Sequence, residues 1–405
     1  MTTPQPYDVA AVRAQFPALT EGAAHFDGPG GTQVPVHVAQ AVASTLTSAI
    51  SNRSPLTASS RRADQVIQDC REAMADLLDT TPTQVVFGRS ATQLTYGVAR
   101  ALSREWGPGD EVVVTRLDHD ANIRPWVHAA EAAGATVRWA GFDRETGELR
   151  IDHLLDVLGG RTRLVAVTGA SNLLGTRPDL ETITAAAHEA GALVCVDAVH
   201  LAPHAVISLQ SMGADLLTCS PYKFLGPHCG VLTGDLQLLE RLHPDKLLPS
   251  SAAVPERFEL GTLPYELMAG TTAAVDVLAD LAPGAAAAGT RRERLVASLT
   301  AIAAHEDALV ERLDDGLDQL AGVTTYGRAR HRAPTRLFSV DGRPSQEVAE
   351  ALAADGVNAP AGSFYALEAS RWLGLGDAGA VRAGMAPYTD DSDVDRLLAV
   401  LKRLC

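Results

Sequence analysis

Residues 215–234, DLLTCSPYKFLGPHCGVLTG, say most about how this chain folds and where it could react. An apolar strand (215–220) runs into small and turn-forming residues that contain Lys223, and a second short strand (231–234) follows. A lysine at the end of a core strand can be desolvated enough to form an imine with a carbonyl compound. The alternative is a solvated loop lysine, and this segment alone does not choose between the two.

Apolar runs upstream of this segment predict a mostly parallel sheet. Most of the runs are continuous rather than alternating, as expected for strands that are buried on both faces. Helical patterns at 121–134 and 180–191 lie between them, and each ends in Gly, a common helix stop. Strand–helix–strand alternation indicates an α/β fold. The further predicted strands are QVVFG (84–88), EVVVT (111–115), TVRWAG (136–141), RLVAVTG (163–169) and ALVCVD (192–197).

The pattern changes beyond about residue 265. Long helices are expected over 266–320, with a break at 281–290 that we interpret as a mobile loop. Short strands near 335–341 and 381–387 and helices at 345–355 and 391–404 follow, which predicts a smaller α+β domain. We therefore expect an N-terminal segment packed on the small domain (1–20), a large domain (21–265) and a small C-terminal domain (266–405).

Composition limits the classes of function. The chain has 405 residues, 46% of them hydrophobic, and a formal net charge of −15, which argues against nucleic-acid binding. The five cysteines include no C-x-x-C pair, so neither a disulfide framework nor a metal site is expected. Neither a secretory signal nor an apolar run long enough to span a membrane is visible, and a cytoplasmic location is the default expectation.

A second candidate group lies in VCVDAVH (194–200). Asp197 ends a predicted strand, and α/β sheets bind ligands at the carboxyl ends of their strands. A buried carboxylate there needs a positive partner, such as a protonated ring nitrogen. His200 follows and could reach the same ring. The alternative role for Asp197 is a helix N-cap.

A third segment, GRSATQLTYGVAR (88–100), opens a helix with small and hydroxyl residues. Free backbone N–H groups at such a helix start can bind phosphate. Ser90 or Thr92 could equally serve only as helix caps.

These motifs together resemble aminotransferase class V, a group of fold-type I pyridoxal 5'-phosphate (PLP) enzymes that contains the cysteine desulfurases, kynureninase and isopenicillin N epimerase. The Asp197 strand followed by S-x-[HY]-K-x-x-G-P carries the resemblance, which covers nearly the whole chain. The other matching segments, in family order, are HFDGPGGTQVP (25–35), RLDHDANIRPW (116–126), ASNLLGTRPDL (170–180), FELGT (258–262) and RAGMAPYTDDSDVDRL (382–397).

The resemblance implies a fold and a cofactor. The fold would be that of a fold-type I PLP-dependent transferase, with a large domain built on a mostly parallel seven-stranded sheet and a smaller α+β C-terminal domain. PLP would be held as a Schiff base on Lys223, which would later move protons. The protein would be a homodimer with shared active sites that acts on a small amino-acid substrate, and neither nucleic acid nor a membrane would be a partner.

The resemblance also implies roles for single residues. Asp197 would keep the pyridine nitrogen protonated, His119 would stack on the ring, and His200 would lie near the ring hydroxyl. Asn172 would lie near the ring oxygen and the substrate carboxylate, which Arg382 would bind as a bidentate pair unless it is a surface arginine. The phosphate contacts implied are Ala91, Thr92, Ser220, Tyr222 and, for the partner subunit's site, Thr262.

The chain departs from the desulfurases at one loop. Those enzymes need a nucleophilic cysteine there, and APAGSFYALE (359–368) has Tyr365 at that place. Cys229 is interpreted as structural. We therefore expect a C–S β-lyase that acts on cysteine or an S-substituted cysteine, with Tyr365 contacting the S-substituent or merely packing. Decarboxylating oxidative deamination, known in class V relatives of natural-product pathways, transamination and epimerisation stay open as alternatives. A true cysteine desulfurase or a PLP-binding regulator fits less well.

Overall fold

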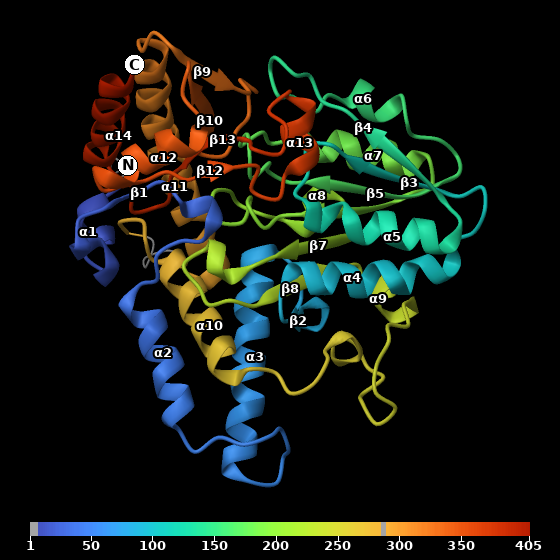
Figure 1. Ribbon diagram of the computed structural model, residues 1–405. Helices are drawn as coiled ribbons and strands as arrows, with labels where there is room; N and C mark the ends of the chain where they lie inside the picture. The colour runs from blue at the N-terminus through green and yellow to red at the C-terminus, as the bar shows by residue number, and fades with distance from the viewer. Residues whose placement is uncertain (1–6, 285–288) are drawn as a thin grey trace.

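The computed structural model describes residues 7–284 and 289–405, and its centre is a seven-stranded sheet (Figure 1). The strand order is β2-β8-β7-β6-β5-β3-β4, and only β8 runs antiparallel to its neighbours. Every strand falls on a predicted segment, so the expected mostly parallel sheet is confirmed. The strands are β2 (Val86–Gly88), β3 (Glu111–Thr115), β4 (Thr136–Ala140), β5 (Thr162–Thr168), β6 (Leu193–Asp197), β7 (Leu216–Cys219) and β8 (Gly230–Gly234).

Both faces of this sheet are buried. In β5, Val165 and Val167 belong to the core on one face, whereas Leu164 and Ala166 belong to the core on the other. This alternation explains why the strands read as unbroken apolar runs. Helices α4 (Ala91–Leu102) and α5 (Arg124–Ala133) pack on the face of Leu164 and Ala166. Helices α3 (Ala58–Leu78) and α7 (Leu180–Glu189) contribute to the core on the opposite face.

A second, four-stranded antiparallel sheet forms the C-terminal α+β part, in the order β12-β13-β10-β9. Helices α11 (Arg291–Asp318), α12 (Ser345–Ala354) and α14 (Asp391–Leu404) contribute to its core. The strands are β9 (Val323–Tyr326), β10 (Thr335–Val340), β12 (Ala361–Gly362) and β13 (Ala380–Gly384), and β1 (Ala24–His25) pairs separately with β11 (Val357–Asn358).

The remaining helices connect and cover these sheets. Helix α10 packs against α2 and α3. A loop was predicted at 281–290, and residues 285–288 of it lie outside the described residues. No described helix is both long and apolar enough to cross a bilayer. The helices are α1 (Val9–Arg13), α2 (Val36–Thr47), α6 (Ile151–Leu155), α8 (Leu209–Met212), α9 (Leu236–Arg241), α10 (Tyr265–Ala279), α11 (Arg291–Asp318), α12 (Ser345–Ala354), α13 (Leu367–Trp372) and α14 (Asp391–Leu404).

The N-terminal segment contacts the C-terminal part of the chain. The Tyr7 hydroxyl donates to the Pro387 carbonyl over 2.9 Å, and Arg13 pairs with Asp393 over 2.7 Å. The division into 1–20, 21–265 and 266–405 stays a prediction.

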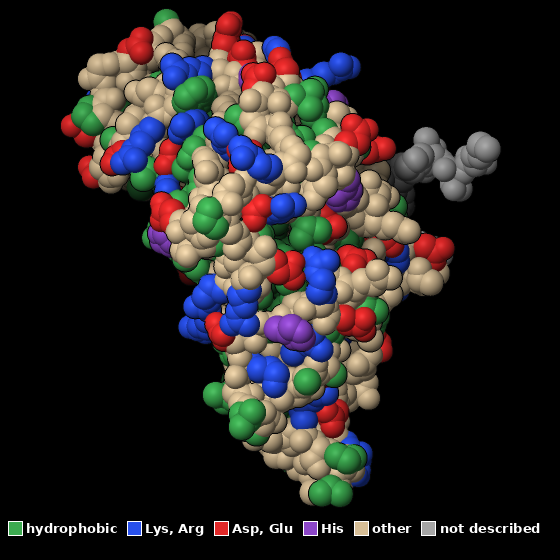
Figure 2. All heavy atoms as spheres, turned by 90° about the vertical axis from the view of Figure 1, so that its right-hand side faces the viewer, with side chains coloured by type: hydrophobic (Ala, Val, Ile, Leu, Met, Phe, Trp, Pro, Cys, Tyr) green, Lys and Arg blue, Asp and Glu red, His purple; other side chains and the backbone are tan. Residues whose placement is uncertain are grey.

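Charges of both signs share the surface. On the face in Figure 2, Lys and Arg side chains lie interspersed with Asp and Glu rather than collected into one basic area. Such a face does not offer the continuous positive potential that a nucleic-acid backbone requires.

Candidate active site

A cavity of about 520 Å³ opens where the carboxyl ends of β5, β6 and β7 meet the C-terminal part of the chain. Thr168, Asp197 and Thr218 come from these strand ends, where α/β sheets place their ligands. The structure brings eleven of the twelve predicted site residues into its lining. They are Ala91, Thr92, His119, Asn172, Asp197, His200, Ser220, Tyr222, Lys223, Tyr365 and Arg382.

Lys223 ends a single 3₁₀ turn, Pro221–Lys223, that follows β7. Its Nζ donates to the Pro29 carbonyl. Burial, reinforced by the nearby Arg382 guanidinium, lowers the pKa of the amine to about 7. The lysine is therefore desolvated rather than a solvated loop residue, and an appreciable fraction is the neutral, nucleophilic form at physiological pH.

Asp197 is buried at the end of β6, and one of its carboxylate oxygens accepts from the Val199 N–H over 2.8 Å. Burial raises its pKa to about 6, while that N–H and Lys223 act in the opposite direction. Turns rather than a helix follow it, so Asp197 does not cap a helix. A cation placed in the cavity would favour the charged carboxylate.

His119 and Tyr365 form one wall of the cavity. Their ring centroids are 5.6 Å apart, and the Asp120 N–H donates to the Tyr365 carbonyl over 2.7 Å. Burial, with smaller contributions from Lys223 and Arg382, lowers the pKa of His119 to about 4, and its Nδ1 accepts from the Ala121 N–H. His119 is thus a neutral ring, suited to stacking on an aromatic ligand.

The start of α4 offers an anion site. The Ser90 side chain caps the Gln93 N–H, whereas the Ala91 and Thr92 N–H groups have no partner among the described residues. Gly230 lies directly behind: a Cβ there would be 2.1 Å from the Ser90 carbonyl carbon, so only glycine lets β8 approach the helix start this closely. Free N–H groups at the positive end of a helix suit a phosphate.

Arg382 and Asn172 form the opposite end of the cavity. Arg382 is buried rather than on the surface, and its Nη1 donates to the Asn172 carbonyl over 2.9 Å. Burial lowers the pKa of this guanidinium to about 9. In the described part of the chain, Arg382 Nε and Asn172 Oδ1 are buried without a hydrogen-bond partner. Such orphaned groups are rare in proteins and are expected where a ligand completes the site.

Thr262 is the one predicted site residue outside this cavity. It is exposed and follows Glu259, whose carboxylate is buried against Arg71 over 2.9 Å. Its position is compatible with a contact to another subunit, and its predicted role stays a prediction.

Several residues that line the cavity were not singled out from the sequence. Most of them lie inside segments that resemble the family's motifs, but the resemblance implied no role for them, and only tertiary contacts show that they line the site. They include Pro29, Gly30, Tyr96, Arg124 and Phe364. The G-P-G-G run at 28–31 was the one available signal, since such runs mark close backbone approach.

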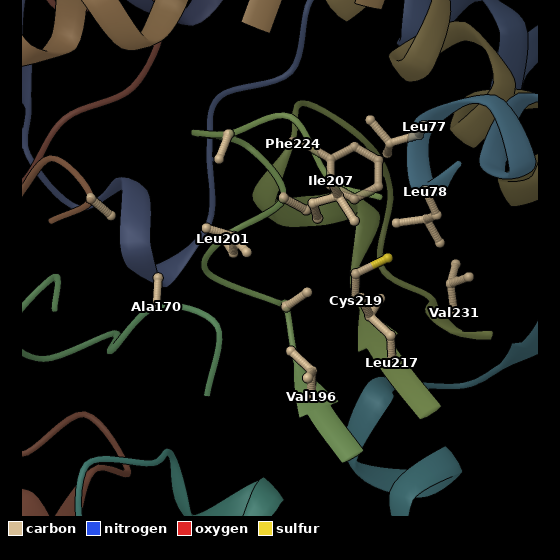
Figure 3. Close-up of a cluster of buried hydrophobic side chains, with 14 of the residues drawn as sticks. Leu77, Leu78, Ala170, Val196, Leu201, Ile207, Leu217, Cys219, Phe224 and Val231 are labelled. Atoms are coloured by element: carbon tan, nitrogen blue, oxygen red, sulfur yellow. The ribbon is translucent and has the colours of Figure 1, made fainter. Parts of the chain in front are cut away.

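None of the five cysteines, all of which lie in the described residues, lines the cavity. Cys219 points into an apolar cluster with Leu77, Leu78 and Val231 (Figure 3). Burial raises the pKa of Cys229 to about 11, which keeps it a thiol. Cys405 is exposed at the end of α14.

Comparisons with known proteins agree with this fold. A sequence model of aminotransferase class V matches residues 24–397. An uncharacterized Mycobacterium tuberculosis protein, MT3887, is 36% identical over 98% of this chain and 99% of its own length. The aminotransferase-like protein FGM3 of Gibberella zeae is 32% identical, over 98% of each chain. The crystal structure of the Escherichia coli cysteine desulfurase CsdA superposes with a TM-score of 0.86 at 27% identity and 98% coverage of both chains.

The fold and the site define a fold-type I, PLP-dependent enzyme. The chain belongs to the aminotransferase class V family, and its cofactor is pyridoxal 5'-phosphate. The lining fits that group, since it offers a desolvated lysine, a buried carboxylate, a neutral histidine ring and free N–H groups at a helix start.

Proposed function

We propose that this protein is a PLP-dependent C–S β-lyase that acts on cysteine or an S-substituted cysteine without using an enzyme thiol. The observation that carries the proposal is that no cysteine lines the cavity, while Tyr365 occupies the loop where a desulfurase needs its thiol. An S-substituent can leave directly as a thiol, so the reaction does not require persulfide formation on the enzyme.

The proposed roles follow from the positions of the side chains. Lys223 holds the cofactor covalently, Asp197 pairs with its ring nitrogen, His119 stacks on the ring, and Ala91 and Thr92 bind its phosphate through backbone N–H groups. Bound PLP supplies an electron sink that acidifies the Cα–H of the amino acid. Ser220, Tyr222, Asn172 and His200 complete the cofactor contacts.

Arg382 and Lys223 have different proposed roles in substrate binding and catalysis. Arg382 binds the α-carboxylate, since its unpartnered Nε and its cationic charge lie at that end of the cavity. Once the substrate amine has displaced it from the cofactor, the freed Lys223 amine accepts the Cα proton, and the Cβ–S bond breaks with its electron pair leaving on sulfur. Lys223 or a water protonates the departing thiolate. With one water consumed, an S-substituted cysteine yields pyruvate, ammonia and a thiol.

Tyr365 is proposed to contact the S-substituent. Its side chain is 76% exposed, so it does not serve core packing, and its ring lies beside His119 at the cavity wall. An exposed aromatic ring at a binding site suits an apolar or sugar-like group by stacking.

A substrate panel tests the proposal. The purified enzyme is incubated with S-substituted cysteines, and pyruvate, ammonia and free thiol are measured. A 2-oxo acid that retains sulfur, with the amine form of the cofactor, would instead indicate an aminotransferase, and CO₂ with an aldehyde a decarboxylating deaminase. Cα inversion alone would indicate an epimerase.

Two variants sharpen this test. Replacing all five cysteines by Ser should leave turnover within a few-fold of wild type when the fold, checked by circular dichroism, is retained. Loss of turnover in that folded variant would refute a thiol-free reaction. The matched control is Lys223→Ala, which keeps the cavity but should abolish turnover.

We further propose a homodimer in which Thr262 reaches the partner's phosphate site. Its exposed position outside its own cavity supports this role. A cytoplasmic location and a place in a natural-product pathway stay predictions.

A further inference from the structure

A line of buried polar side chains runs from the cavity wall into the C-terminal part of the chain. His200 lines the cavity, and His204 packs against it edge-on, with ring centroids 5.3 Å apart and planes at 73°. Nδ1 of His204 lies 2.9 Å from Oε2 of Glu306 on α11, and both side chains are buried. The His204 ring, held by Glu306, therefore packs in a fixed orientation against the His200 ring.

His200 is a neutral imidazole. Burial is the main cause that lowers its pKa well below the usual range, and the nearby His204, Arg382 and Lys223 act in the same direction. A neutral imidazole carries its proton on either Nδ1 or Nε2. The choice of tautomer decides whether the nitrogen that faces a ligand donates or accepts a hydrogen bond.

Thr335, on β10, decides between these tautomers. Its Oγ1 lies 2.9 Å from Nε2 of His200, and within residues 7–284 and 289–405 the hydroxyl has no other acceptor. If Nε2 carried the proton, the buried hydroxyl proton of Thr335 would be left without a partner, which is unfavourable in a protein interior. If Thr335 donates to Nε2 instead, both groups are satisfied and the imidazole proton is on Nδ1.

Because Nε2 of His200 contacts Thr335, Nδ1 is the ring nitrogen that is available to a ligand in the cavity. It has no hydrogen-bond partner among the described residues, and the side chain to which it belongs lines the cavity. A ligand in the cavity can therefore reach it.

We propose that Thr335 is a positioning residue that holds His200 in its Nδ1–H form, so that His200 presents a hydrogen-bond donor to an oxygen of bound PLP. The His204–Glu306 pair supports the ring from the side. The inference rests on the PLP cofactor and does not depend on which substrate bond is cleaved.

Nitrogen NMR of the holoenzyme with ¹⁵N-labelled histidine tests the tautomer directly. The His200 signals, assigned by their loss in His200→Asn, should show a protonated Nδ1 and an unprotonated Nε2. The opposite pattern, or a doubly protonated ring at neutral pH, would overturn the proposal.

The variants Thr335→Val and Thr335→Ser form a matched pair, because only serine keeps the hydroxyl. Thr335→Val should weaken PLP binding by roughly 5- to 10-fold, as expected for one lost buried hydrogen bond, and should shift the cofactor's absorption maximum. Thr335→Ser should restore both within about twofold on the same scale. Wild-type affinity and spectrum in Thr335→Val would refute the role of the hydroxyl. If that variant does not fold, the wild-type tautomer still decides the question.

Discussion

The guanidinium carbon of Arg382 lies 3.7 Å from the centroid of the Phe364 ring. Phe364 and Tyr365 both have positive φ, 52° and 58°, a conformation that costs energy in non-glycine residues. Two contacts hold this strained pair: Asn172 Nδ2 donates to the Phe364 carbonyl over 2.9 Å, and the Asp120 N–H donates to the Tyr365 carbonyl. The loop thus places an aromatic face against the proposed carboxylate-binding arginine.

Phe364→Leu should therefore weaken binding of the amino acid. A cation–π contact of this kind contributes about 1 kcal/mol, so we expect KM to rise roughly 5-fold. The value of kcat should change less, because Phe364 does not reach the proton-transferring lysine in this proposal. Steady-state kinetics on the best substrate of the panel measures both, and an unchanged KM would show that Phe364 serves packing alone.

Lys223 should carry the cofactor. The holoenzyme should be yellow, with absorption at roughly 410–430 nm. Borohydride reduction followed by peptide mapping should place the pyridoxyl group on Lys223, with Lys246 on the surface as an internal control. A label on another lysine would end this assignment.

Cofactor uptake should depend on pH through Lys223. The reactive form of the amine is the neutral one, and its pKa in the folded protein is about 7. The rate of PLP uptake by cofactor-free protein should therefore rise between about pH 6 and 8 and then level off. A solvated lysine would give a rate still rising toward about pH 10. Stopped-flow absorbance distinguishes these profiles.

Asp197→Asn should bind PLP but turn over slowly. The amide cannot keep the ring nitrogen protonated, so the electron sink is weakened. We expect kcat to fall by roughly 100-fold or more, the scale of one preorganised electrostatic contact at an active site. Asp315→Asn, away from the cavity lining, provides the control, and near-normal turnover in Asp197→Asn would place the ring nitrogen elsewhere.

The buried pair Arg71–Glu259 should matter for stability. Glu259 Oε1 also accepts from the Phe87 N–H over 3.0 Å, so removing Arg71 leaves a buried carboxylate without its cation. Arg71→Met should lower the free energy of unfolding by about 3–5 kcal/mol. The exposed pair Arg312–Asp395 is the control, and Arg312→Met should cost about 1 kcal/mol or less. Urea unfolding compares the two, and equal losses would contradict this reasoning.

The central sheet was predictable because most of its strands are apolar runs buried on both faces, and the half-exposed edge strand β4 still has β-branched and aromatic residues. Strands β1, β11 and β12 were not predicted, because two residues leave too little pattern to recognise, and the half-exposed β9 was missed because it has no apolar run. Most of the site was predicted from motif resemblance. Thr335 was not, because its contact with His200 joins residues 135 positions apart and no local pattern reports it.

The residues that form the site lie far apart in the sequence. Lys223 contacts the Pro29 carbonyl, whereas Arg382 contacts Asn172. During synthesis on the ribosome, a chain made only as far as Lys223 lacks Arg382, which helps to lower the pKa of that amine in the folded protein. The amine and the proposed carboxylate-binding arginine can therefore come together only after the residues between them have been made and folded.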